Sequence, residues 1–229
     1  MPWRLNRKLI RLFIFLAVTG SLGITAAETY AGERILYSIH PLGGQAEYSD
    51  QGMVKLGNKD VKLLIFKTDT AFFKDVEKIY YDPATFFVFR VERFIEAWFG
   101  KEHIIEEYNQ QKYTVTTNKF KDDKLVNRQV VQSDGPIYNA VTMPFYLRLI
   151  QQPALGWRFK FRVPNVFEVV LDSVVKLRIS GNTYRAYHFV SVPKNFEIWI
   201  DSEPPFIPIK IKGQGGLSYT FTLEEYNRN

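Results

Sequence analysis

Cysteine is absent from the 229 residues of this sequence. Its absence excludes disulfide bonds, thiolate metal sites and cysteine nucleophiles. Small secreted eukaryotic domains more often depend on disulfides, so an exported chain without cysteine is more typical of a bacterial envelope protein whose core is stable alone. The hydrophobic share of 46% is ordinary for a globular protein and is enough to build such a core.

Histidine is scarce as well: the chain has only His40, His103 and His188, far apart in sequence. His188 shares the parity of its apolar neighbours, so we interpret the histidines as structural or surface residues rather than metal ligands. The sequence also lacks a Gly-x-Ser-x-Gly elbow, a His-Glu-x-x-His helix and the glycine patterns that bind phosphates or dinucleotides. It therefore predicts no catalytic residue, no metal site and no cofactor, and it favours a protein that is not an enzyme.

Glycosidases need paired acids, and pairs of adjacent acids occur at Glu106-Glu107 and Asp122-Asp123. Adjacent residues of a strand point to opposite faces, so neither pair is well placed to act on one bond. Asp122-Asp123 also lies between two lysines, which is typical of a solvated turn.

Basic charge is concentrated at the start of the chain. The formal net charge is +6, but Arg4, Arg7, Lys8 and Arg11 all precede the first acid, Glu28. Without these four cations the remainder carries +2. A chain so nearly balanced does not have the basic face that tracks phosphates, so we predict no nucleic-acid partner.

The basic segment is followed by an uncharged apolar run, Leu12–Leu22, and by the small residues of Ile24–Ala27. This order of regions is typical of a secretory signal peptide. The apolar run is shorter than the roughly 20 residues that a permanent transmembrane helix needs. We predict a signal peptide over residues 1–27, cleaved after Ala27 or, alternatively, after Ala31.

The remaining residues, 28–229, contain no linker, no low-complexity tract and no repeat at a fixed period. We predict that they form a single β-rich domain in the periplasm or outside the cell. Such a protein has no permanent membrane span after cleavage; an uncleaved N-terminal anchor is the alternative.

Alternating apolar residues predict strands through most of this domain. Ile35, Tyr37 and Ile39 share one parity, and 16% of the chain is aromatic, which suits a half-buried pleated surface. Ser180–Thr183 is the clearest hairpin, because its Gly-Asn pair supplies the positive φ of a two-residue turn. Apolar residues keep one parity on both sides of it: Phe167, Val169, Leu171, Val175, Leu177 and Ile179 before the turn, with Ser173 the exception, and Tyr184, Ala186, His188, Val190 and Val192 after it.

Two segments are ambiguous. Thr85–Trp98 fits both a strand and a helix, and its aromatic and β-branched content favours a strand. Pro144–Ile150 predicts one or two helical turns, because proline suits the first position of a helix and Leu147 and Ile150 are helically spaced. The predicted fold is mainly β: an antiparallel curved sheet or a barrel or half-barrel, with one short helix.

Several motifs, in order, resemble the DUF3108 family of exported bacterial proteins of unknown function. They are Gly32–Tyr37 (GERILY), Tyr81–Phe86 (YDPATF), Ala140–Arg148 (AVTMPFYLR) before Gly156, Ile198–Asp201 (IWID) and Ile207–Ile211 (IPIKI). The resemblance spans about Glu33 to Tyr226. It implies a β protein of the periplasm or outer envelope and supplies no catalytic residue.

Three residues are candidates for ligand binding: Arg148, Tyr146 and Trp199. Arg148 lies in an apolar helical turn, where burial of an unpaired guanidinium is costly, so it either reaches solvent, pairs with a carboxylate or meets an anionic head group. A tryptophan on a strand is most often part of the core, and that reading holds for Trp199 as well.

Three functions fit these observations. The first is non-enzymatic binding of a lipid or another apolar or amphipathic small molecule inside a curved sheet. The second is assembly with another envelope protein through an exposed edge strand. The third, the least favoured, is a hydrolase of glycans or peptides whose acids come together only in the fold.

Overall fold

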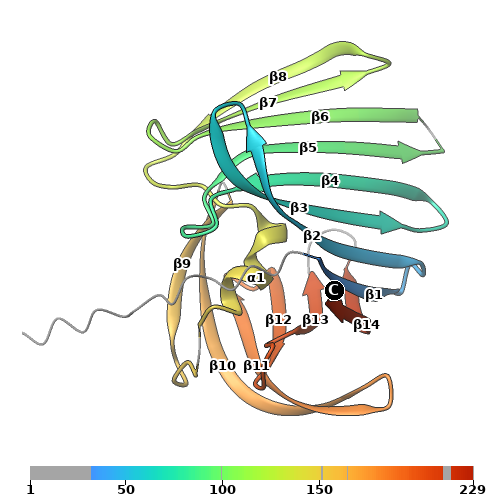
Figure 1. Ribbon diagram of the computed structural model, residues 1–229, viewed down its shortest axis with the longest axis vertical. Helices are drawn as coiled ribbons and strands as arrows, with labels where there is room; N and C mark the ends of the chain where they lie inside the picture. Colours follow the sequence, from blue (N-terminus) through green and yellow to red (C-terminus); the bar gives the residue numbers. More distant parts are fainter. Residues whose placement is uncertain (1–31, 99, 151, 164, 214–217, 229) are drawn as a thin grey trace, which may run out of the picture.

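The computed structural model describes residues 32–98, 100–150, 152–163, 165–213 and 218–228 (Figure 1). The predicted signal peptide, residues 1–27, lies outside the described residues, as do both cleavage positions, Ala27 and Ala31. Within the described ranges, no helix combines the length and the apolar character of a membrane-crossing segment.

In these ranges the chain forms strands, one short 3-10 turn and one short α-helix. The elements are β1 (Glu33–His40), β2 (Gln45–Leu56), β3 (Lys59–Asp69), β4 (Phe73–Tyr81), β5 (Val88–Ala97), β6 (Gly100–Asn109), β7 (Thr114–Lys121), β8 (Lys124–Gln132), η1 (Ala140–Thr142), α1 (Met143–Leu147), β9 (Arg158–Val163), β10 (Asn165–Ile179), β11 (Asn182–Val192), β12 (Phe196–Asp201), β13 (Pro208–Gly213) and β14 (Tyr219–Arg228).

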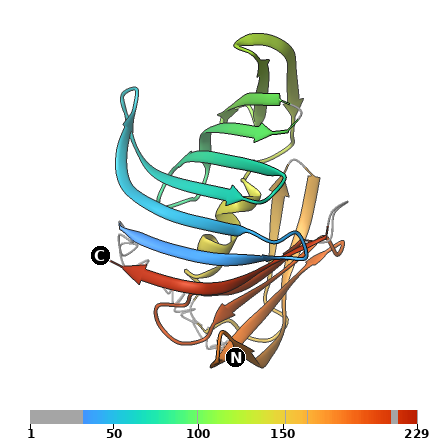
Figure 2. The ribbon, with the colours of Figure 1, turned by 90° about the vertical axis from the view of Figure 1, so that its right-hand side faces the viewer.

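All strands belong to one 14-stranded sheet in the order β8-β7-β6-β5-β4-β3-β2-β1-β14-β13-β12-β11-β10-β9. Neighbours are antiparallel throughout, and most are consecutive hairpins. The exception is the central pair, β1 with β14, which joins the two ends of the described chain (Figure 2). The sheet is strongly curved and is not closed, because β8 and β9 remain edges. The predicted mainly β fold is confirmed.

Alternation places one face of the sheet in the core. Ile35, Tyr37 and Ile39 of β1 are buried, whereas the residues between them are partly exposed. The ambiguous segment is also a strand, β5, but its buried residues Val88 and Val91 are three positions apart, because the register of β5 against β4 shifts next to Val88. The period of two therefore predicted the buried face of β1, whereas in β5 a register shift interrupts it.

The hairpin between β10 and β11 is confirmed, but its turn lies one residue earlier than expected. The two loop residues are Ser180 and Gly181, which have φ of 49° and 85°, and Asn182 already belongs to β11. The exception at Ser173 also has a structural reason. The register of β10 against β11 shifts between Leu171 and Ser173, as in a β-bulge.

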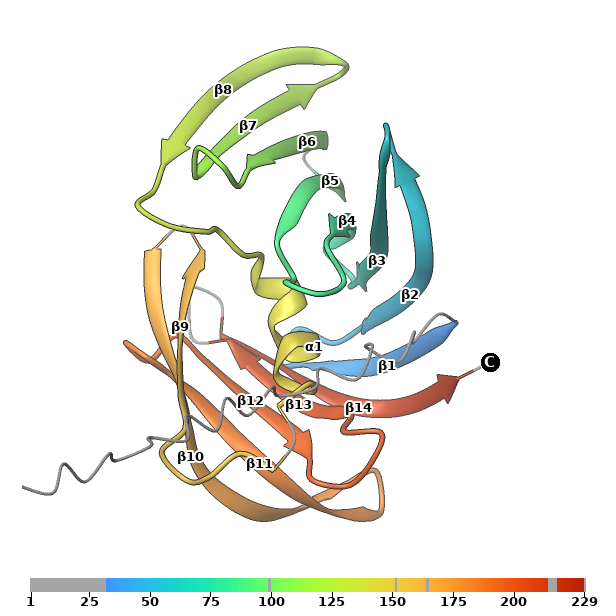
Figure 3. The same cartoon turned by 60° about the vertical axis from the view of Figure 1, so that its left-hand side comes forward.

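The short helix lies on the concave side of the sheet, between the β1–β8 half and the β9–β14 half (Figure 3). It is shorter than predicted, because α1 ends at Leu147 and Arg148 is its C-cap. Pro144 occupies its first turn, as expected. Phe145 is buried, and its ring lies 5.1 Å from that of Tyr48 on β2. The helix therefore fills part of the space that the curved sheet encloses.

Candidate functional site

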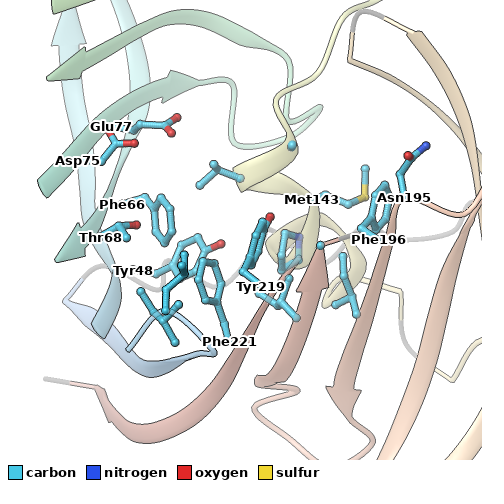
Figure 4. Close-up of a pocket in the computed structure, with 18 of the residues that line it drawn as sticks. Tyr48, Phe66, Thr68, Asp75, Glu77, Met143, Asn195, Phe196, Tyr219 and Phe221 are labelled. Atoms are coloured by element: carbon cyan, nitrogen blue, oxygen red, sulfur yellow. The ribbon is translucent and has the colours of Figure 1, made fainter. Parts of the chain in front are cut away.

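A cavity of about 540 Å³ remains on the concave side of the sheet, next to α1. Its walls come mainly from β2, β3 and β4, from the segment of η1 and α1, and from β12, β13 and β14, and β1, β5 and β9 contribute one residue each (Figure 4). Most of the lining is aromatic or aliphatic. The aromatic members are Tyr48, Phe66, Phe73, Phe161, Phe196, Tyr219 and Phe221.

The aromatic rings form a continuous surface along the cavity. The ring centroids of Tyr48 and Phe66 are 4.5 Å apart, and those of Tyr219 and Phe221 are 4.7 Å apart. Phe66 and Phe221, at 5.9 Å, connect the two pairs across strands from opposite halves of the sheet. Burial raises the pKa of Tyr48 and Tyr219, so both phenols are neutral at physiological pH.

One end of the cavity is charged. Asp75 and Glu77 of β4 lie there, as Figure 4 shows, and Arg93 of β5 lines the same end. The Arg93 guanidinium binds mainly to Asp75: its Nε donates to Oδ2 at 2.9 Å, and its Nη2 contacts the same carboxylate. Glu77 lies directly opposite Arg93 in the ladder, but its Oε1 is 3.4 Å from Nε.

The Glu77 carboxyl is therefore buried, and its cationic partner, Arg93, lies too far away for a good hydrogen bond. The side chain is 11% exposed and accepts no hydrogen bond within the described part of the chain. Burial raises its pKa from 4.5 to about 7; Arg93 lowers the value, and the nearby carboxylates of Asp75 and Glu106 raise it. This carboxyl thus exchanges its proton near neutral pH, which an exposed glutamate does not do.

A second cavity of about 500 Å³ continues over the concave face of β4 to β8. It shares Glu77, Arg93, Ala140 and Val141 with the first cavity, so the charged group lies where the two meet. Glu106 of β6 lines the second cavity and accepts a hydrogen bond from the Tyr108 hydroxyl at 2.6 Å. Its neighbour Glu107 is exposed, as alternation of adjacent acids predicts.

The predicted ligand residues do not line either cavity. The Arg148 guanidinium meets the carboxylate of Glu33, with both side chains 1% exposed, and its Nη2 also donates to the Pro205 carbonyl at 2.9 Å. Of the three alternatives for Arg148, the structure shows the carboxylate partner. This ion pair connects the C-terminal end of α1 to β1.

Tyr146 and Trp199 lie in two further places, so the structure does not bring the three together. Tyr146 packs on Phe159, with ring centroids 4.7 Å apart, outside the lining of both cavities. Trp199 follows Ile198, which lines the cavity, and so faces the other side of β12. There it stacks on His188 at 4.4 Å, with Lys210 4.7 Å from its ring centroid.

Sequence reasoning missed Asp75, Glu77 and Arg93. The signal was the parity of β4: Asp75 and Glu77 share the inward phase of Ile79 and Tyr81, and all four are buried. Acids at inward positions of a strand are rare, because a buried charge is costly without a partner. They could have been singled out on that ground.

No family model and no curated protein matches this chain. Among solved structures, the chain is similar to a β-barrel-like protein of the domain of unknown function DUF1849 from Brucella abortus. The two share 7% sequence identity, and the match covers 88% of this chain and 99% of the other, with a TM-score of 0.48. That neighbour does not bear on DUF3108, so the resemblance to DUF3108 stays a prediction.

Proposed function

We propose that this protein is an exported envelope protein that binds an apolar or amphipathic small molecule without transforming it, in the cavity beside α1. The observation that carries the proposal is the cavity of about 540 Å³, with its mostly aromatic and aliphatic lining. Ligand pockets in proteins commonly have about 300–1,000 Å³ and place a few polar groups among apolar walls.

The distribution of polar groups supports binding of an elongated amphipathic molecule. Aromatic side chains occupy the middle of the cavity, and the charged residues are gathered at one end, on β4 and β5 (Figure 4). An apolar chain could lie along the rings, while a polar group meets the charged end. The contacts that bury the apolar chain of the ligand would supply most of the binding affinity.

A hydrolase is less well supported by the same geometry. A glycosidase needs two carboxyl groups on either side of the scissile bond, about 5–10 Å apart. Here the acids that line the cavities are Asp75 and Glu77 on β4 and Glu106 on β6, the two strands on either side of β5. They share one wall, and the strands of the facing wall, β12–β14, contribute no acid to the lining.

The proposed location rests on the predicted signal peptide of residues 1–27, and the resemblance to DUF3108 agrees with it. The mass of the protein isolated from a bacterial envelope fraction tests this part. A mature chain that begins at Glu28 supports export with cleavage after Ala27, and one that begins at Gly32 supports cleavage after Ala31. A full-length protein confined to the cytoplasm would refute export.

Binding is tested with Nile red, a neutral apolar dye, and with a variant that fills the cavity. Val141 lines both cavities, so Val141→Trp places an indole where the ligand would lie. We expect it to weaken Nile red binding about tenfold or more. The matched control is Val130→Trp, at a residue 57% exposed on β8, which should bind as the wild type does.

Lipid extraction provides the second readout. Mass spectrometry of the protein purified from its envelope fraction should show a co-purifying amphiphile in the wild type and less of it in Val141→Trp. Clean extracts together with no saturable Nile red binding would refute the proposal.

Assembly through an edge strand is the second candidate, and β8 is the observation that favours it. This strand pairs only with β7, and its Leu125, Val126 and Val130 are each more than half exposed. An apolar open edge can add a strand from another protein. If so, Val126→Lys should abolish capture of a partner from envelope extract and leave Nile red binding unchanged.

A further inference from the structure

The walls of the two cavities carry an excess of negative charge. Their ionisable acids are Asp75, Glu77 and Glu106, and Arg93 is the one cation in the lining that the structure describes. Three carboxyls therefore share one guanidinium, and two of them, Asp75 and Glu77, are only 7% and 11% exposed, although the Arg93 side chain is 40% exposed. The charges of such buried carboxyls interact more strongly than charges at the surface.

Arg93 does not neutralise these acids evenly. Both its Nε and its Nη2 bind Asp75, which forms the closest ion pair of the group. Glu106 has the Tyr108 hydroxyl as its donor at 2.6 Å. Glu77 is left with Arg93 Nε at 3.4 Å, too far for a good hydrogen bond, at the place shared by both cavities.

A buried carboxylate in this position needs a positive partner. Where no such partner binds, a proton takes that role, which agrees with a pKa of about 7 for Glu77. A ligand that brings its own positive charge would replace the proton and form a charge-assisted hydrogen bond. A carboxylate or phosphate on the ligand would instead add a fourth negative group to this wall, at a considerable cost.

We propose that the cavity binds a cationic amphiphile, with its ammonium group at Glu77 and its apolar chain along Tyr48, Phe66 and Phe221. This inference rests on the proposed binding function and adds the chemical class of the ligand. The aromatic rings next to the charged end suit the same ligand, because ring faces attract cations.

The groups around Glu77 decide how binding depends on pH. Asp75 on the same strand is held by Arg93 on β5, and Glu106 lies on β6. Tyr48, Tyr108 and Tyr219 also surround it, and burial raises the pKa of each phenol, so none ionises between pH 6 and 8. Glu77 is thus the acid in this group whose proton an ammonium ligand displaces in that range.

The sign follows from this competition. An alkylammonium keeps its charge between pH 6 and 8, whereas the Glu77 carboxyl loses its proton over the same range. The competent, ionised fraction rises about tenfold from pH 6 to 8, and the affinity for the ammonium should rise by about the same factor. A neutral ligand gains nothing from the ionised carboxylate.

The experiment compares three ligands with the same chain, dodecylamine, dodecanol and dodecanoate, as competitors of Nile red below their micelle concentrations. Wild type, Glu77→Gln and the exposed control Glu107→Gln are measured at pH 6, 7 and 8. We expect dodecylamine to bind wild type at least about tenfold more tightly than dodecanoate at pH 8. Glu77→Gln should remove this preference and the pH dependence, and Glu107→Gln should keep both.

The outcomes separate this inference from the proposed function. Dodecanoate binding as tightly as dodecylamine, or an amine affinity independent of pH in the wild type, would overturn the cationic ligand and leave the binding cavity in place. If none of the three displaces Nile red, or the dye does not bind, the binding function itself is wrong. The wild-type pH series decides the matter even if Glu77→Gln fails to fold.

Discussion

Arg148, at the end of α1, and Glu33, the first residue of β1, form a bidentate ion pair, although they are 115 positions apart in the sequence. Nη1 donates to Oε2 at 2.6 Å and Nη2 donates to Oε1 at 2.7 Å. Both side chains are 1% exposed. Such a pair fixes the helix against the centre of the sheet, and it makes each partner dependent on the other.

Arg148→Ala should therefore destabilise the protein strongly, because it leaves the Glu33 carboxylate buried without its cation. We expect the free energy of unfolding to fall by about 3–5 kcal/mol, measured by urea denaturation. Lys55→Ala, which breaks an exposed pair with Asp60, serves as the control and should cost less than about 1 kcal/mol. Unchanged stability with lost ligand retention would instead place Arg148 at an anionic head group.

Trp199 should matter for stability and not for binding. Its ring lies between His188 and Lys210 on the side of β12 away from the cavity. Trp199→Ala removes this buried surface and should lower the free energy of unfolding by about 2–4 kcal/mol. The affinity for Nile red, measured where the variant is folded, should stay within about twofold of wild type. A large loss of affinity at intact stability would return Trp199 to the binding site.

Glu77 should make stability fall as pH rises. Because burial raises the pKa of this carboxyl from 4.5 to about 7, the folded state holds its proton more firmly than the unfolded state does. The resulting stabilisation is complete below about pH 4.5 and is lost as pH rises through 7, a change of about 3 kcal/mol. Glu77→Gln has no proton to lose.

Urea denaturation at pH 5 and pH 8 measures this effect. The stability of Glu77→Gln relative to wild type should be higher at pH 8 than at pH 5, by up to about 3 kcal/mol. Glu107→Gln, at an exposed residue, should show a difference of less than about 0.5 kcal/mol between the two pH values. A pH-independent difference for Glu77→Gln would mean that Glu77 is ionised throughout the range.

Two glycines with positive φ should differ in how well they accept a side chain. A Cβ on Gly44, where φ is 89°, would lie 2.1 Å from the carbonyl oxygen of Asp69. Gly57, where φ is 59°, has open space around that position within the described structure. We expect Gly44→Ala to cost about 2–4 kcal/mol and Gly57→Ala about 1 kcal/mol, measured by thermal unfolding. Equal costs would mean that the backbone at Asp69, at the end of β3, moves to admit the methyl group on residue 44.

The sequence allowed the strands to be predicted where burial follows a period of two, as at Ile35, Tyr37 and Ile39. It allowed the helical turn to be predicted, because Pro144 marks a helix start by its fixed φ. These signals are local. The break at Ser173 was visible in the pattern, but its cause, a shift of register against β11, appears only when the partner strand is known.

The candidate site was not predictable in the same way. The sequence indicated that Arg148, in an apolar turn, needs a partner, but that partner, Glu33, comes from β1, which is far away in the sequence. Asp75 and Arg93 sit on neighbouring strands, so their contact needed the correct register of β4 against β5. The aromatic surface of the cavity combines Phe66 of β3 with Phe221 of β14, and no spacing rule in the sequence brings these two residues together.

The pairing of β1 with β14 has a consequence for how the protein is made. Ser38 and Thr222 are neighbours in this ladder although 184 residues separate them. During synthesis β1 emerges before its partner exists, and it stays an open edge until the last strand arrives. Contacts so distant along the chain form slowly. A product truncated before Tyr219 would keep Ile35, Tyr37 and Ile39 beside that open edge, where they invite aggregation and engagement by chaperones.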